Sequence, residues 1–135
     1  EIVLSCASAD GVDLNGLPPC QRCVAFAVDP AACRSGRWSG PVGRQHQPEL
    51  FELLVPHKEA LSSISRTHFE VVLLDGLDGA VCIRKLSGNP LLLDDRPLPQ
   101  HEAVPAQEGG RIAFTGTSDT DPSFLEFRVR LRSVQ

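Results

Sequence analysis

The stretch FLEFRVRL, residues 124–131, alternates apolar and charged side chains. Every second residue from Leu125 to Leu131 is apolar, and the residues between them carry charges. This period of two is typical of a strand with one face towards a core and the other towards water. The stretch therefore predicts a long, half-buried strand with Leu125, Phe127, Val129 and Leu131 facing the core.

Other segments have the same character, and turn-forming residues separate them. Val81 and Ile83 alternate with Cys82 and Arg84, and further strands are predicted at 2–5, 24–28, 69–74, 91–93 and 111–115. Glycine and proline number 11 each and leave little room for long helices. The Asp-Gly pairs in 75–79 suit a hairpin turn. We predict an all-β fold, a β-sandwich of two twisted sheets with about 10–11 strands and little helix.

One segment is ambiguous between helix and strand. Leu50, Leu53 and Leu54 have helical spacing, and Pro56 would end such a helix. A short helix and a short strand both remain open there. The least regular segments are expected at 7–19, 30–41, 99–109 and 116–122, which hold much of the Gly, Pro, Ser and Asp.

Length and composition indicate a single globular domain over residues 1–135. Apolar residues make up 41% and charged residues 22% of the 135 residues. The net charge of −4 argues against direct nucleic-acid binding, and no apolar run approaches the roughly 20 residues of a membrane span. Because methionine is absent, we expect the chain to be part of a longer protein. We expect the isolated domain to be monomeric.

The cysteines offer one possible metal site. Cys6, Cys20, Cys23 and Cys33 lie close in sequence, and 20–23 is a Cys-x-x-Cys run that would suit structural zinc. The remaining spacings form no second close pair, and the segment contains no histidine. A disulfide framework would need an oxidising compartment. We therefore predict reduced thiols, with no metal and no cofactor.

No pattern in the chain indicates catalysis. The sequence lacks a nucleophile elbow, an HExxH run and a phosphate-cradling glycine loop of either common type. The chain is therefore predicted not to be an enzyme, although a longer parent protein could carry a catalytic domain.

Three spaced elements instead suit anion binding by loops on a rigid sheet. They are VGR at 42–44, SISRTHF at 63–69 and LSGNP at 86–90. Arg44 offers a planar fork of N–H donors that matches phosphate oxygens, and Ser65 offers a hydroxyl donor. The amide of Asn89 can pair with an extended peptide backbone.

These three elements, in this order and spacing, resemble the forkhead-associated (FHA) domain family. Residues 91–98 and 110–112 are similar to the family's final hairpins. The resemblance covers roughly 24–131 and is strongest over 42–98, which leaves 1–23 as an N-terminal strand and loop extension.

The resemblance implies a sandwich whose loops at one end bind phosphothreonine segments of partner proteins, for signalling-dependent assembly. By position, Arg44 and Ser65 would contact the phosphate, and Arg66 would lie at the rim. Gly88 and Asn89 would belong to the loop that holds the peptide backbone. Phosphothreonine signalling and reduced cysteines together suggest an intracellular location, in the nucleus or the cytoplasm.

Two further residues of the matched motifs have structural roles in such domains. His68 would brace the loops, and Gly43 would allow close approach of backbone.

The sequence departs from the family's pattern in the peptide-holding loop. Pro90 replaces the usual glycine after Asn89, and Gly88 stands where many relatives have threonine or serine. These departures motivate an alternative function, a degenerate FHA scaffold used for phosphate-independent interaction or dimerisation.

Overall fold

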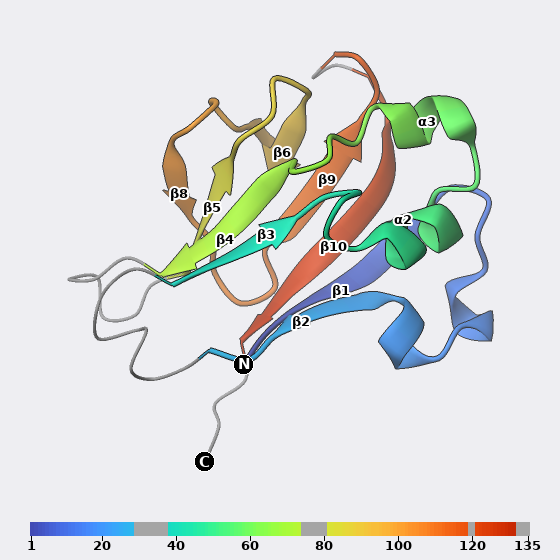
Figure 1. The fold of residues 1–135 in the computed structure, drawn as a ribbon, viewed down its shortest axis with the longest axis horizontal. Coiled ribbons are helices and arrows are strands. Elements are labelled where there is room, and N and C mark those ends of the chain that lie inside the picture. Colours follow the sequence, from blue (N-terminus) through green and yellow to red (C-terminus); the bar gives the residue numbers. More distant parts are fainter. Residues whose placement is uncertain (29–37, 74–80, 119–120, 132–135) are drawn as a thin grey trace.

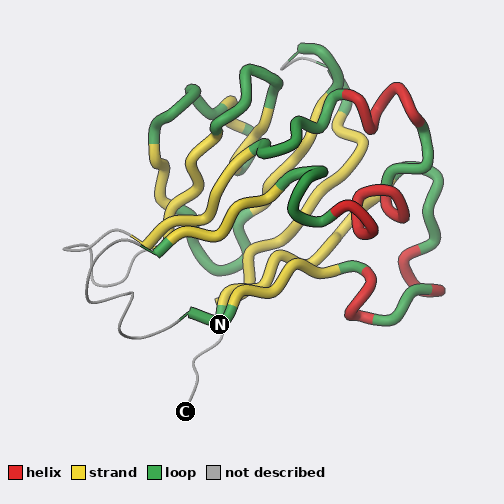
Figure 2. Tube along the Cα trace, viewed as in Figure 1, coloured by secondary structure: helices red, strands yellow, loops and turns green. Residues whose placement is uncertain are grey.

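A computed structural model describes residues 1–28, 38–73, 81–118 and 121–131, which form a sandwich of two antiparallel sheets (Figure 1, Figure 2). Apolar side chains from both sheets meet in one core cluster between them. The described residues contain ten strands, so the predicted all-β sandwich of about 10–11 strands is confirmed.

The larger sheet has six strands in the order β2-β1-β10-β9-β6-β7. They are β1 (Ile2–Ala9), β2 (Cys23–Phe26), β6 (Leu91–Leu93), β7 (Arg96–Pro97), β9 (Arg111–Thr115) and β10 (Ser123–Leu131). On β10 the predicted alternation holds at Leu125, Phe127 and Val129, which are buried. The prediction for Leu131 is wrong, since this residue is 41% exposed. It is the last residue of β10 and pairs with Ile2 near the end of the sheet.

The smaller sheet has four strands in the order β3-β4-β5-β8. They are β3 (Ser39–Val42), β4 (Phe69–Leu73), β5 (Val81–Lys85) and β8 (Ala103–Pro105). Val42 lies opposite Phe69 in the β3–β4 pair, and Phe69 lies opposite Lys85 in the β4–β5 pair. This register brings the end of β3, the start of β4 and the end of β5 to one end of the sheet.

The ambiguous segment around Leu50 is a helix, α2 (Pro48–Leu54). Pro48 occupies its first turn, where a missing N–H has no cost, and Glu49 suits the positive end of the helix. A second helix, α3 (Lys58–Ser62), was not expected from the sequence. Two single-turn 3-10 helices, η1 (Leu14–Gly16) and η2 (Pro19–Gln21), precede β2.

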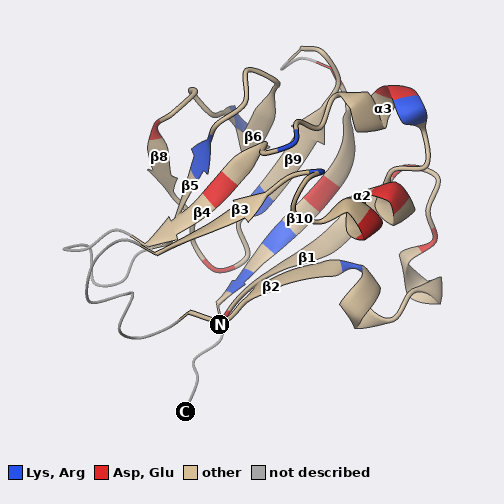
Figure 3. Cartoon of the chain, in the orientation of Figure 1, with Lys and Arg blue, Asp and Glu red and all other residues tan. Residues whose placement is uncertain are grey.

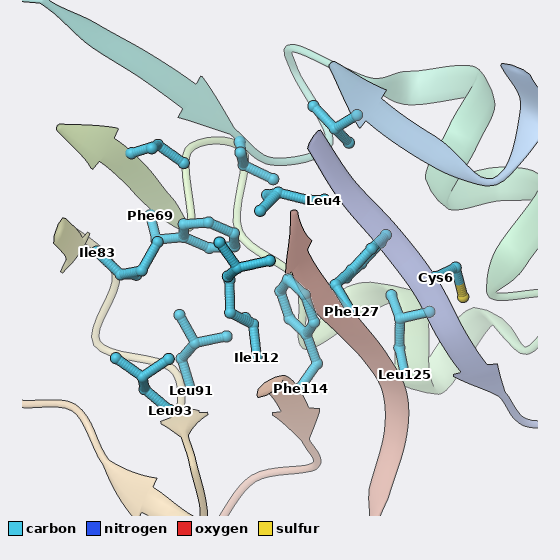
Figure 4. Packing of buried hydrophobic residues seen from close by; sticks show 14 of the residues in the cluster. Leu4, Cys6, Phe69, Ile83, Leu91, Leu93, Ile112, Phe114, Leu125 and Phe127 are labelled. Carbon is cyan, nitrogen blue, oxygen red and sulfur yellow. The ribbon is translucent and has the colours of Figure 1, made fainter. Parts of the chain in front are cut away.

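The ring of Phe114, on β9, lies at the centre of the core (Figure 4). Its centroid is 5.9 Å from that of Phe51 on α2, 6.0 Å from Phe69 on β4 and 6.2 Å from Phe127 on β10. One residue therefore contacts both sheets and helix α2. Such aromatic contacts add to the stabilisation from buried area.

The predicted irregular segments contain more regular structure than expected. β1 continues to Ala9, β3 begins at Ser39, and β8 lies within the segment 99–109. The sequence does not predict β3 and β8, because both are short and contain proline and so show no readable alternation. For β1 it predicts only residues 2–5. The predicted turn at 75–79 lies outside the described residues.

Candidate functional site

Three loops meet at the end of the smaller sheet, and they carry all the residues that the sequence predicts for a phosphopeptide site. The loops follow β3 (43–47), precede β4 (63–68) and join β5 to β6 (86–90). The registers of β3–β4 and β4–β5 place them side by side. Figure 3 shows basic segments on the loop after β3 and on the loop before β4.

Backbone hydrogen bonds join the first two loops beyond the end of the sheet. The N–H of Arg44 donates to the Ser65 carbonyl (3.1 Å), and the N–H of Gln45 donates to the Arg66 carbonyl (3.0 Å). Gly43 permits this approach, because a Cβ atom built there would lie only 2.2 Å from the Arg66 carbonyl oxygen. The close backbone approach expected at Gly43 is therefore present.

Arg44, Gln45 and Arg66 line a depression at this end of the molecule. The Arg44 side chain is half-buried, and its Nε donates to the carbonyl of Ile64. No hydrogen bond within the described residues engages its two terminal nitrogens. Arg66 is exposed. The depression therefore presents two guanidinium groups to an anion.

Ser65 and Asn89 meet across the second and third loops. The Asn89 Nδ2 donates to the Ser65 Oγ (3.0 Å), and the Asn89 backbone N–H donates to the Ser87 Oγ (2.9 Å). The Ser65 and Ser87 hydroxyls are also hydrogen-bonded to each other. The sequence indicates Ser87 only as part of the motif at 86–90 and does not predict its contacts with both residues.

His68 is fully buried and connects the same two loops. Its Nδ1 accepts the N–H of Ser65 (3.1 Å), so the ring proton is on Nε2, which donates to the Pro90 carbonyl (3.1 Å). Burial lowers the pKa of His68 to about 4, and the nearby Lys85 charge acts in the same direction against the opposing bond to Pro90. The ring is therefore neutral at physiological pH and holds both bonds.

The two departures from the family pattern differ in their surroundings. Gly88 is exposed, and a Cβ atom built on it would meet nothing within 4 Å. Pro90 supplies the carbonyl that His68 binds, and this contact does not require an N–H at that position. The loop thus keeps its connection to His68 despite the proline.

Gln47 also supports the loop after β3, although no sequence signal identified it. Its Oε1 accepts the Gly43 N–H (2.9 Å), and its Nε2 donates to the Pro41 carbonyl (3.0 Å). The side chain thereby closes the turn that carries Arg44.

The cysteines do not form a metal site in the part of the chain that the structure describes. No three His, Cys, Asp or Glu side chains in it are grouped as a metal would require, and Cys33 lies outside it. Cys6 is buried, and burial raises the pKa of its thiol to about 11. Cys20 is exposed and Cys23 half-buried.

None of the described helices is long and apolar enough to cross a membrane.

The family model of the FHA domain matches residues 42–115, more than half of the chain and all three loops. The chain therefore belongs to the FHA domain family. No curated protein matches the sequence significantly.

Solved structures of FHA domains share the fold at low sequence identity. An engineered FHA domain with a Myc-pTBD peptide is 17% identical, with 97% of this chain and 91% of that chain covered and a TM-score of 0.65. The N-terminal FHA domain of Rad53p from S. cerevisiae, solved with a phosphothreonine peptide, is 15% identical, with 97% and 93% covered and a TM-score of 0.65. The human APLF FHA domain, solved with an XRCC1 bisphospho peptide, is 16% identical, with 97% and 98% covered and a TM-score of 0.55.

Proposed function

We propose that this domain binds phosphothreonine segments of partner proteins through Arg44, Ser65 and Asn89, with Arg66 at the rim. One observation carries the proposal: these residues, far apart in sequence, converge on adjoining loops at one end of the sheet. Membership of the FHA family and the phosphopeptides bound to two of the structural neighbours support it.

The chemistry of the site suits a phosphate group. A phosphothreonine carries a charge of about −1.5 to −2 and three acceptor oxygens. The terminal nitrogens of Arg44, which bind no other described residue, can donate to two of these oxygens in a planar fork, and Ser65 can donate to a third. Arg66 adds positive charge from the exposed side of the depression.

Asn89 suits the peptide backbone beside the phosphate. Its Nδ2 is bound to Ser65, and within the described residues its Oδ1 has no hydrogen-bond donor. That oxygen can accept a backbone N–H of an extended peptide, while Nδ2 keeps the side chain fixed. The Gly88 and Pro90 positions, on either side of Asn89, would then influence which peptide sequences bind.

The test is a titration of the domain with a phosphothreonine peptide library, with phosphoserine and unmodified forms of each selected peptide alongside. Phosphorylated peptides should bind at least about tenfold more tightly than unmodified ones, because a hydrogen bond to a charged group contributes about 1.5–3 kcal/mol. Arg44→Ala should remove most of this difference.

The matched control is Arg130→Ala, which removes the same charge from an exposed position on β10, a strand that contributes none of the three loops. It should leave the phosphate dependence unchanged. Equal binding of plain and phosphorylated peptides by the wild-type domain would contradict the proposal and favour the phosphate-independent scaffold.

We further propose that the isolated domain is monomeric and acts in the nucleus or the cytoplasm. A monomer is enough for the proposed site, because all its residues come from one chain. Light scattering of the purified domain should give the mass of a single chain, and a dimer would contradict this part of the proposal.

A further inference from the structure

Ser87 is hydrogen-bonded to two of the residues that would contact a phosphopeptide, Ser65 and Asn89. Ser87 is buried, with 8% of the residue exposed, whereas Ser65 is half-buried at the site. Its Oγ contacts the Ser65 Oγ and accepts the Asn89 N–H at 2.9 Å. It therefore belongs to a three-residue network whose other members face the ligand.

The donors in this network can be assigned from chemistry. A backbone N–H can only donate, so the Ser87 Oγ accepts from Asn89. The Nδ2 of Asn89 can also only donate, so the Ser65 Oγ accepts from it. One hydrogen remains to link the two hydroxyls, and either serine can supply it.

Burial decides between these two arrangements. If Ser65 donated to Ser87, the Ser87 hydrogen would be left inside the protein without an acceptor among the described residues, which is costly. If Ser87 donates to Ser65, the hydrogen left over is that of Ser65. This residue is at the site, where water or a ligand can accept the hydrogen.

We propose that Ser87 is a positioning residue for the phosphate site: its hydroxyl donates to the Ser65 Oγ and thereby directs the Ser65 hydroxyl hydrogen outward, towards the phosphate. The inference rests on the proposed phosphopeptide function and deepens it. Ser87 itself does not touch the ligand. The Ser65 oxygen accepts the hydrogen of the buried Ser87 hydroxyl. The hydrogen of the Ser65 hydroxyl is then available to the phosphate.

A double-mutant cycle distinguishes this role from simple support of the loop. The probe is the tightest phosphothreonine peptide from the library titration. Ser87→Ala should weaken its binding about fivefold to tenfold, and Ser65→Ala about tenfold or more. The double variant should lose clearly less affinity than the sum of the two single losses, because Ser87 has no hydroxyl left to orient once that of Ser65 is gone and keeps only its bond to the Asn89 N–H.

Additive losses in the double variant, or unchanged binding by Ser87→Ala, would overturn the inference. Ser8→Ala, which removes an exposed hydroxyl from β1, should bind as the wild type does. Thermal unfolding of each variant checks the fold. If Ser87→Ala is unfolded, Ser87→Cys keeps the volume with a weaker donor and should give a smaller loss that also shrinks when Ser65 is replaced.

The two proposals fail in different ways. A wild-type domain without phosphate dependence contradicts the proposed function, and the role of Ser87 with it. A phosphate-dependent domain whose Ser87→Ala variant retains full affinity contradicts only the role of Ser87.

Discussion

Gly43 has no side chain, and this allows the backbones of the loop after β3 and the loop before β4 to come into contact. Gly43→Ala should destabilise the domain by about 2–4 kcal/mol, because the added methyl would lie 2.2 Å from the Arg66 carbonyl oxygen and the backbone would have to move. Urea unfolding measures the change. Gly16→Ala is the control, since a Cβ there meets nothing within 4 Å, and a similar loss in both variants would contradict the steric explanation.

The buried His68 makes stability depend on pH. The unfolded ring binds a proton near pH 6.5, but the folded ring, with a pKa of about 4, does not until the pH is much lower. Between these values the unfolded state holds more protons, so stability falls as the pH drops, by roughly 3 kcal/mol in total.

The measurement is urea unfolding from pH 7 to pH 4. His68→Gln should lose stability overall but show a flatter pH dependence than the wild type. His57→Gln, at an exposed histidine, should keep the wild-type slope. An unchanged slope in His68→Gln would show that groups other than His68 cause the pH dependence of stability.

At the scale of single residues, the sequence indicates a candidate site residue only where a suitable side chain also stands at the expected place in a motif. Arg44 and Ser65 could be selected because their motifs occur in the expected order. The contacts of Ser87 and Gln47 could not be predicted, because they depend on which loops lie side by side and on which hydroxyl is buried.

Among the elements, the loop between β5 and β6 contains an exposed glycine, Gly88, beside Asn89. Gly88→Ser should add a hydroxyl donor at the site and tighten phosphopeptide binding about threefold to tenfold. The melting temperature should change little, because the space around a Cβ at Gly88 is open. Peptide titration and thermal unfolding test both expectations.

Gly16→Ser is the matched control for this change. It also enters open space, but it lies on η1, outside the three loops, and should leave peptide binding unaltered. Unchanged or weaker binding by Gly88→Ser would show that the position does not face the phosphate.

Elements with a clear two-residue period were predictable, and short elements were not. The long β10 was evident from its alternation, whereas β8 has three residues ending in proline and is held by its pairing with β5. The five-residue α3 is too short to show a helical period. Its position depends on tertiary contacts that no local pattern contains.

For the whole molecule, stability should be most sensitive to Phe114. Phe114→Ala should destabilise the domain by about 3–5 kcal/mol, because it removes ring contacts to both sheets and α2 and leaves a cavity. Urea unfolding gives the change, with Leu131→Ala as an exposed control at the end of β10. A loss below about 1 kcal/mol would contradict the central role of this ring.

The bond from the Arg44 Nε to the Ile64 carbonyl has a consequence for the kinetics of recognition. A free arginine side chain has about 2 kcal/mol of rotamer entropy to lose when it is immobilised. Here part of that loss accompanies folding, so the guanidinium is already oriented when a peptide arrives. Association rates should then vary little among phosphopeptides, and the lifetimes of the complexes should separate strong partners from weak ones.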